Sequence, residues 1–136
     1  MPTLPQDAEG RVLVVEHDPA QSTFVAHALK DAGFDVEIAT SHEEALAKTG
    51  TGFEVVLVNI RFGGDSGIAF AERIRSVQHD ECKVVFIGEL PDKETGVEAL
   101  DSGDALLLAP FSKAVLTTEI QRLTDDLTLE ANYGQR

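Results

Sequence analysis

The sequence predicts an α/β fold, a doubly wound sheet of five parallel strands with five helices on its two faces. Five short apolar runs are separated by amphipathic helical patterns that begin at capping residues. Most of these runs lack alternation, as expected for strands that are buried on both faces. The chain has 136 residues, 43% of them hydrophobic, which is enough for one core but not for two ordinary domains.

The first strand and helix follow a lead-in, residues 1–10, which has two prolines and no periodicity. Residues 11–15 form a β-branched run that is typical of a buried strand. Asp18 then marks a helix start, because Pro19 occupies the first helical position and Gln21 the capping-box position. The apolar stripe of this helix comprises Phe24, Val25, Ala28 and Leu29.

The second strand, residues 34–39, alternates apolar with acidic side chains, which indicates an edge strand with one wet face. A capping box at 41–44 opens a short helix that closes near the glycines of 50–52. The third apolar run ends on Asn59 and enters a glycine-rich loop, which leads to a third helix at 68–77. One face of that helix carries Ile68, Ala71 and Ile74.

Two further apolar runs, residues 83–87 and 105–108, predict the fourth and fifth strands. A weaker helical pattern lies between them at 92–102, where an interior Gly96 costs about 0.5–1 kcal/mol relative to alanine. We therefore expect this segment to be mobile. Its strong apolar anchors are Val97 and Leu100.

The last helix begins at Ser112, a favourable capping residue. The polar end of the chain predicts a loose tail at 129–136, so the folded domain is expected to span residues 11–128. The apolar stripe of the last helix comprises Leu116, Ile120, Leu123 and Leu127.

The composition excludes several classes of function. The formal net charge is -13 and the pI is about 4.5, so direct binding to nucleic acid or to an anionic membrane is disfavoured. The single Cys82 excludes an internal disulfide framework, and the four histidines lack the ligand spacing of a zinc site. The N-terminus lacks signal-peptide features and no apolar run could span a bilayer, so we expect a cytoplasmic protein.

Four segments in order carry a resemblance to a known family: VLVVEHDP at 12–19, VVLVNIRFGGDSG at 55–67, KVVFIGE at 83–89 and LLLAPF at 106–111. Over nearly its whole length, the chain resembles the receiver domain of bacterial two-component response regulators. The resemblance implies the flavodoxin-like strand order 2-1-3-4-5. It also implies a site where the carboxyl ends of the first and third strands meet.

The resemblance also implies what should stand at each strand end. In that family the first strand ends in an acidic pair that holds magnesium, and the third ends in the aspartate that accepts a phosphoryl group. The fourth strand ends in threonine or serine and the fifth in Lys-Pro. Only the first position of the acidic pair keeps the family chemistry here. The corresponding residues in this chain are Glu16 and His17, Asn59, Gly88 and Ala109.

These replacements predict a degenerate pocket. Phosphoryl transfer needs a carboxylate nucleophile, a divalent metal and a cation for the developing charge. Asn59 cannot ionise, and Glu16 with backbone oxygens is a poor set of magnesium ligands, so magnesium binding should be weak or absent. We predict a pseudo-receiver, a non-enzymatic module of two-component or phosphorelay signalling that acts through protein contacts without phosphorylation.

Three alternatives remain open at this point. The first is a regulator that is phosphorylated on a different carboxylate, Asp18, Asp65 or Glu16. The second is a small-molecule sensor that has reused the pocket. The third is a regulator whose output domain lies outside this sequence.

Arg61 lies two residues beyond the phosphoacceptor position, where a side chain can lean over the pocket. We hypothesise that Arg61, or a protonated His17, pairs with Glu16 and fills the space of the magnesium ion. A solvent-facing arginine is the alternative.

The segment from residue 89 to residue 104 contains six acidic residues and one basic residue, Lys93. It predicts a docking face for a protein partner with a basic surface, and a homodimer is also possible. The alternative is an ordinary solvated face. The candidate acidic face comprises Glu89, Asp92, Glu94, Glu98, Asp101 and Asp104.

Overall fold

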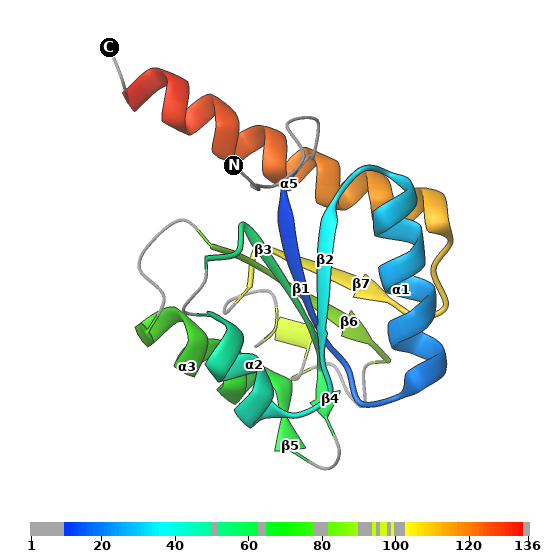
Figure 1. Ribbon diagram of the computed structural model, residues 1–136. Helices are drawn as coiled ribbons and strands as arrows, with labels where there is room; N and C mark the ends of the chain where they lie inside the picture. Colours follow the sequence, from blue (N-terminus) through cyan, green and yellow to red (C-terminus); the bar gives the residue numbers. More distant parts are fainter. Residues whose placement is uncertain are drawn as a thin grey trace.

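The computed structural model describes residues 10–49, 52–62, 65–77, 82–89, 94, 96–97, 99 and 103–134. The sheet has five parallel strands in the order β2-β1-β3-β6-β7, which confirms the predicted α/β class and strand order (Figure 1). The strands are β1 Arg11–Val15, β2 Asp35–Ala39, β3 Val55–Asn59, β6 Lys83–Gly88 and β7 Ala105–Leu108.

Helices cover both faces of this sheet, with α1 and α5 on one side and α2 and α3 on the other (Figure 1). Within the described ranges, none of them is long and apolar enough to cross a membrane. The predicted fourth helix is described only at residues 94, 96–97 and 99, which are helical. The helices with complete bounds are α1 Pro19–Asp31, α2 His42–Thr49, α3 Gly67–Val77 and α5 Lys113–Gly134.

A short antiparallel hairpin follows β3 and was not predicted. It consists of β4 Arg61–Phe62 and β5 Asp65–Ser66, and it lies beyond the end of β3 at the bottom of Figure 1. The backbone of Asp65 belongs to β5 and not to the glycine-rich loop that the sequence predicts after the third strand. Strands of two residues are too short to give a periodic pattern of apolar residues, so the sequence did not distinguish them from a glycine-rich loop.

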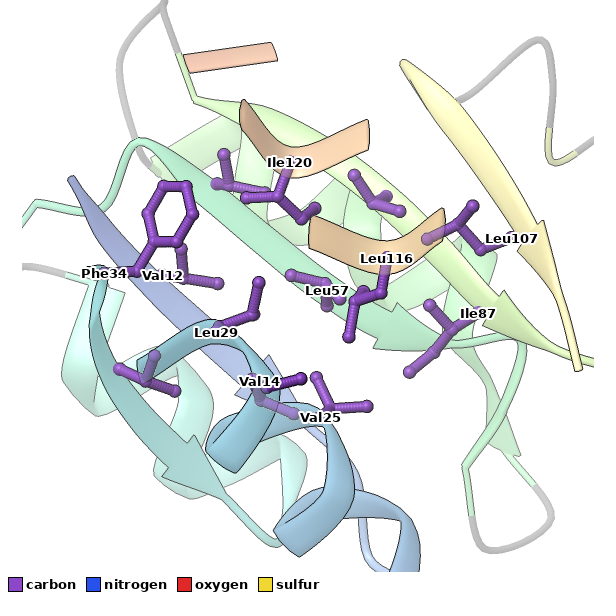
Figure 2. Packing of buried hydrophobic residues seen from close by; sticks show 14 of the residues in the cluster. Val12, Val14, Val25, Leu29, Phe34, Leu57, Ile87, Leu107, Leu116 and Ile120 are labelled. Carbon is purple, nitrogen blue, oxygen red and sulfur yellow. The ribbon is translucent and has the colours of Figure 1, made fainter. Parts of the chain in front are cut away.

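The core has two parts, one on each face of the sheet. On the α1 and α5 side, Leu29, Leu57 and Leu116 are fully buried and interlock between the helices and the strands (Figure 2). On the other side, Phe70 and Ile74 of α3 pack against β3 and β6. Each such side chain contributes about 1.5–3 kcal/mol by leaving water, so the two layers fix the strand ends firmly.

Two predicted anchor residues are exposed. Phe24 was placed in the stripe of α1 but is 40% exposed, and its ring packs at 6.1 Å on the half-buried Phe111. Val97 is 60% exposed, whereas Ala99 is fully buried. Residues two apart lie on nearly opposite sides of a helix, so only one of this pair can face the sheet. The other predicted anchor, Leu100, lies outside the described residues.

The last helix is longer than predicted. It continues to Gly134, so residues 129–134 are helical rather than a loose tail. Leu129, Glu130 and Ala131 are good helix formers, and the next residue that stops a helix is Gly134. Polarity alone therefore did not mark the end of this helix. The predicted lead-in lies outside the described residues up to residue 9.

Cys82 is buried at the start of β6. Burial raises the pKa of its thiol to about 12, so the reactive thiolate is scarce at neutral pH. Cys82 is therefore a passive thiol of the buried core.

Candidate functional site

The carboxyl ends of the central strands form an open cleft of about 870 Å³. It lies between the start of α1, the end of β3 and the residues that follow β6 and β7. The cleft brings together all the predicted pocket residues: Glu16, His17, Asn59, Arg61, Gly88 and Ala109. It also contains four residues that were not assigned to the pocket: Asp18, Pro19, Gln21 and Glu89.

Glu16 is the buried acid of this cleft, with 1% of its surface exposed. It directly follows β1, and its backbone N–H donates to the Ala39 carbonyl at 3.1 Å. Its Oε1 accepts a hydrogen bond from Asn59 Nδ2 at 2.7 Å, and its Oε2 accepts from the Asp18 backbone N–H at 3.2 Å. A buried carboxylate is costly unless donors surround it, and here both oxygens have donors from the protein itself.

Asn59 uses both ends of its carboxamide. While Nδ2 donates to Glu16, Oδ1 accepts from the backbone N–H of Arg61 at 2.9 Å. The side chain therefore connects the end of β1 to the start of β4. A neutral amide can do this because it is a donor at one end and an acceptor at the other.

His17 and Arg61 relate to Glu16 in different ways. His17 Nδ1 lies 3.5 Å from Glu16 Oε2, and its side chain is half exposed. Arg61 is exposed and reaches the cluster through its backbone N–H. Among the described residues, no ion pair joins the Arg61 guanidinium to Glu16. The hydrogen-bond donor closest to this acid is Asn59, which the sequence hypothesis did not consider.

We expect an Arg61→Ala variant to keep its free energy of unfolding within about 0.5 kcal/mol of the unmodified chain, because the backbone contact survives the substitution. Urea denaturation followed by circular dichroism measures this. A loss above about 1 kcal/mol would show that the guanidinium itself holds the pocket.

Asp18 has the predicted capping role, with Oδ1 accepting from the Ala20 N–H at 3.3 Å. The backbone N–H of Asp18, which the capping-box pattern assigned to Gln21, instead donates to Glu16. The buried acid therefore contributes to starting α1. The position of Asp18 after a strand end was the available signal that it would line the cleft.

Gly88 and Ala109 close the far side of the cleft. Gly88 ends β6 with a φ of 124°, and its carbonyl accepts from the Ala109 N–H at 2.9 Å. Neither residue offers a side-chain hydroxyl or cation to the cleft. The ends of β6 and β7 are thus held together by the backbone.

The sequence profile of the response regulator receiver domain matches residues 12–121. The chain belongs to this family. A receiver domain from Methanospirillum hungatei has a crystal structure that resembles this one with a TM-score of 0.81 at 26% identity. That match covers 88% of this chain and 97% of the other.

Two longer curated proteins are also similar to this receiver domain. The transcriptional regulatory protein TrcR of Mycobacterium tuberculosis is 29% identical over 116 residues, which are 83% of this chain and 44% of TrcR. The acid tolerance regulatory protein ActR of Sinorhizobium medicae is 32% identical over 114 residues, which are 82% of this chain and 58% of ActR. The receiver domain thus spans less than two thirds of either relative.

The cleft of this receiver domain is a poor fit for a divalent cation. Glu16 is the buried acid of the cleft, and both of its oxygens already accept hydrogen bonds from the protein. Magnesium requires several hard oxygen ligands in near-octahedral geometry. In the part of the chain that the structure describes, no cluster of three His, Cys, Asp or Glu residues could hold a metal.

The candidate acidic face is only partly described. Glu89 lies exposed at the cleft, and Glu94 is exposed on a helical residue. Asp104 is engaged within the domain, because its Oδ2 accepts from Arg75 Nη2 and from the Val84 N–H, both at 2.8 Å. Its charge is therefore less available to a partner than predicted. The other three acids, Asp92, Glu98 and Asp101, lie outside the described residues.

Proposed function

We propose that this receiver domain is a pseudo-receiver, a non-enzymatic signalling module that acts through protein contacts and takes no phosphoryl group. The observation that supports this most is the Asn59 carboxamide, hydrogen-bonded to the buried Glu16 at 2.7 Å. It occupies the strand end where the family resemblance implies a nucleophile.

The chemistry of Asn59 supports the proposal. A carboxamide carries no negative charge, and its oxygen here accepts a hydrogen bond from the Arg61 N–H, so its lone pairs are poor nucleophiles. Phosphoryl transfer also needs a metal and a cation to balance the charge of the transferred group. Glu16 alone is an inadequate metal site, and Ala109 supplies no cation.

In this proposal the module signals through surfaces that bind other proteins. The formal charge of -13 favours a partner with a basic surface, and a second copy of the chain is an additional candidate. Direct binding to nucleic acid or to an anionic membrane is disfavoured by the same charge. We propose that the module needs no magnesium.

Two observations favour testing two other functions, phosphorylation on a different carboxylate and small-molecule sensing. Asp18 lines the cleft with an exposed carboxylate, which makes it the candidate for a substitute phosphoacceptor. The cleft volume of about 870 Å³ is also within the range of small-molecule sites. A thermal-shift screen with nucleotides and metal ions separates a sensor from an interaction module, because only a ligand that binds the folded state raises the melting temperature.

We expect no phosphoryl adduct when the domain is treated with acetyl phosphate and magnesium chloride and then measured by intact mass. A receiver domain with a phosphoacceptor aspartate, treated in parallel, serves as the positive control for the reagent. An adduct that forms on this chain but not on its Asp18→Asn variant would assign phosphorylation to Asp18. An adduct on both would contradict the proposal and require peptide mapping.

A further inference from the structure

Gly88 lies against the side chain of Asn59, on the neighbouring strand. A Cβ atom built on Gly88 would lie 2.8 Å from Asn59 Oδ1, 3.4 Å from Cγ and 3.6 Å from Nδ2. The first of these distances is shorter than any normal carbon–oxygen contact, so a side chain at residue 88 and the observed Asn59 conformation exclude each other. The φ of 124° at Gly88 further disfavours any other residue.

We propose that Gly88 is a positioning residue that leaves space for the Asn59 carboxamide, so that Glu16, Asn59 and Gly88 form one lock across the ends of β1, β3 and β6. The inference rests on the proposed function in one respect, because the lock explains how the pocket stays assembled without a metal. The lock is a conformation of the protein, so it can be tested without a phosphodonor.

The lock has a definite physical basis. If a side chain at residue 88 displaced the Asn59 carboxamide, two hydrogen bonds would be lost together, one to Glu16 Oε1 and one from the Arg61 N–H. Glu16 would then be a buried carboxylate with one fewer donor, which is costly. The backbone bonds from Ile60 N–H to Ile87 and from Ala109 N–H to Gly88 extend the same connection to β6 and β7.

The side-chain amide of Asn59 reports the lock directly. The chain has two asparagines, Asn59 and Asn132, so a sample labelled with ¹⁵N-asparagine gives two pairs of side-chain amide signals, one pair from each carboxamide. We expect hydrogen exchange of the Asn59 amide to become at least about tenfold faster in a Gly88→Ala variant, the change that corresponds to the loss of one charge-assisted hydrogen bond. Unchanged exchange would overturn the proposal.

Gly52→Ala is the matched control. Gly52 also has a positive φ, 84°, but a Cβ there would meet nothing within 4 Å. This variant carries backbone strain without a clash, so the Asn59 amide should exchange as slowly as in the unmodified chain. Faster exchange in both glycine variants would assign the effect to general destabilisation and overturn the proposal.

A double-mutant cycle gives an independent test, with Gly88→Ala, Asn59→Ala and the two combined. The strain of a positive φ is present in both backgrounds and cancels, whereas the clash with the carboxamide exists only beside Asn59. We expect the decrease in the urea midpoint of the combined variant to be smaller than the sum of the decreases in the two single variants. If Gly88→Ala alone fails to fold, the combined variant should still fold.

Additive losses, or failure of both variants that carry Gly88→Ala to fold, would overturn the lock. Because the cycle uses no phosphodonor, that result would leave the acetyl phosphate experiment unaffected, and an adduct in that experiment would not decide the cycle.

Discussion

A Gly67→Ala variant is expected to lose about 3 kcal/mol of its free energy of unfolding, at the upper end of what overpacking costs. A Cβ at this first residue of α3 would overlap the Asn59 carbonyl oxygen and lie 2.9 Å from the Asn59 carbonyl carbon. These are backbone atoms of a central strand, which cannot rotate away as a side chain can. Urea denaturation followed by circular dichroism measures the loss, which is a large share of the stability of a small domain.

Gly52→Ala again supplies the comparison, because its Cβ would lie in open space. A positive φ without a clash should cost that variant about 1 kcal/mol. If the two alanine variants lost equal stability, the close approach of α3 to the end of β3 would not be a packing constraint.

An Asn59→Asp variant is expected to lose about 2 kcal/mol or more in the absence of divalent ions, and to recover stability when magnesium chloride is added. The substitution replaces the donor that now faces Glu16 Oε1 at 2.7 Å with a carboxylate oxygen, so two acids meet in a buried site. A divalent cation between them would relieve the repulsion. Thermal unfolding at several magnesium concentrations measures both effects.

An Asn59→Ala variant distinguishes the effect of the lost hydrogen bonds from the effect of the added negative charge. It removes the same hydrogen bonds but introduces no carboxylate, so it should be destabilised and remain insensitive to magnesium. A magnesium response in the alanine variant or in the unmodified chain would show that the cleft holds a cation without an acid at residue 59, contrary to the donor arrangement around Glu16.

The sequence was sufficient for the sheet, because apolar runs such as 11–15 and 83–87 alternate along the chain with amphipathic helical patterns. This alternation is typical of parallel strands that pair side by side and are covered by helices on both faces. The sequence also located the cleft, since the carboxyl ends of parallel strands must meet at one edge. The six predicted pocket residues line that edge for this reason.

What the sequence could not supply was the direction of individual side chains. It suggested Arg61 or His17 as the partner of Glu16, whereas Asn59 donates the shortest bond. That depends on the register between β1 and β3 and on the empty space above Gly88, neither of which is visible in a local pattern. The choice between Val97 and Ala99 as an anchor likewise depends on which side of the helix faces the sheet.

The contact between Gly88 and the Asn59 carboxamide also bears on evolution. If the pocket descends from a phosphorylated one, the order in which its reactive residues could be restored is constrained. A hydroxyl residue at 88 would collide with Asn59, and an aspartate at 59 would face Glu16 without a cation. Either substitution alone would give a less stable protein. The contact between Gly88 and Asn59 would therefore oppose the stepwise return of a phosphorylation site.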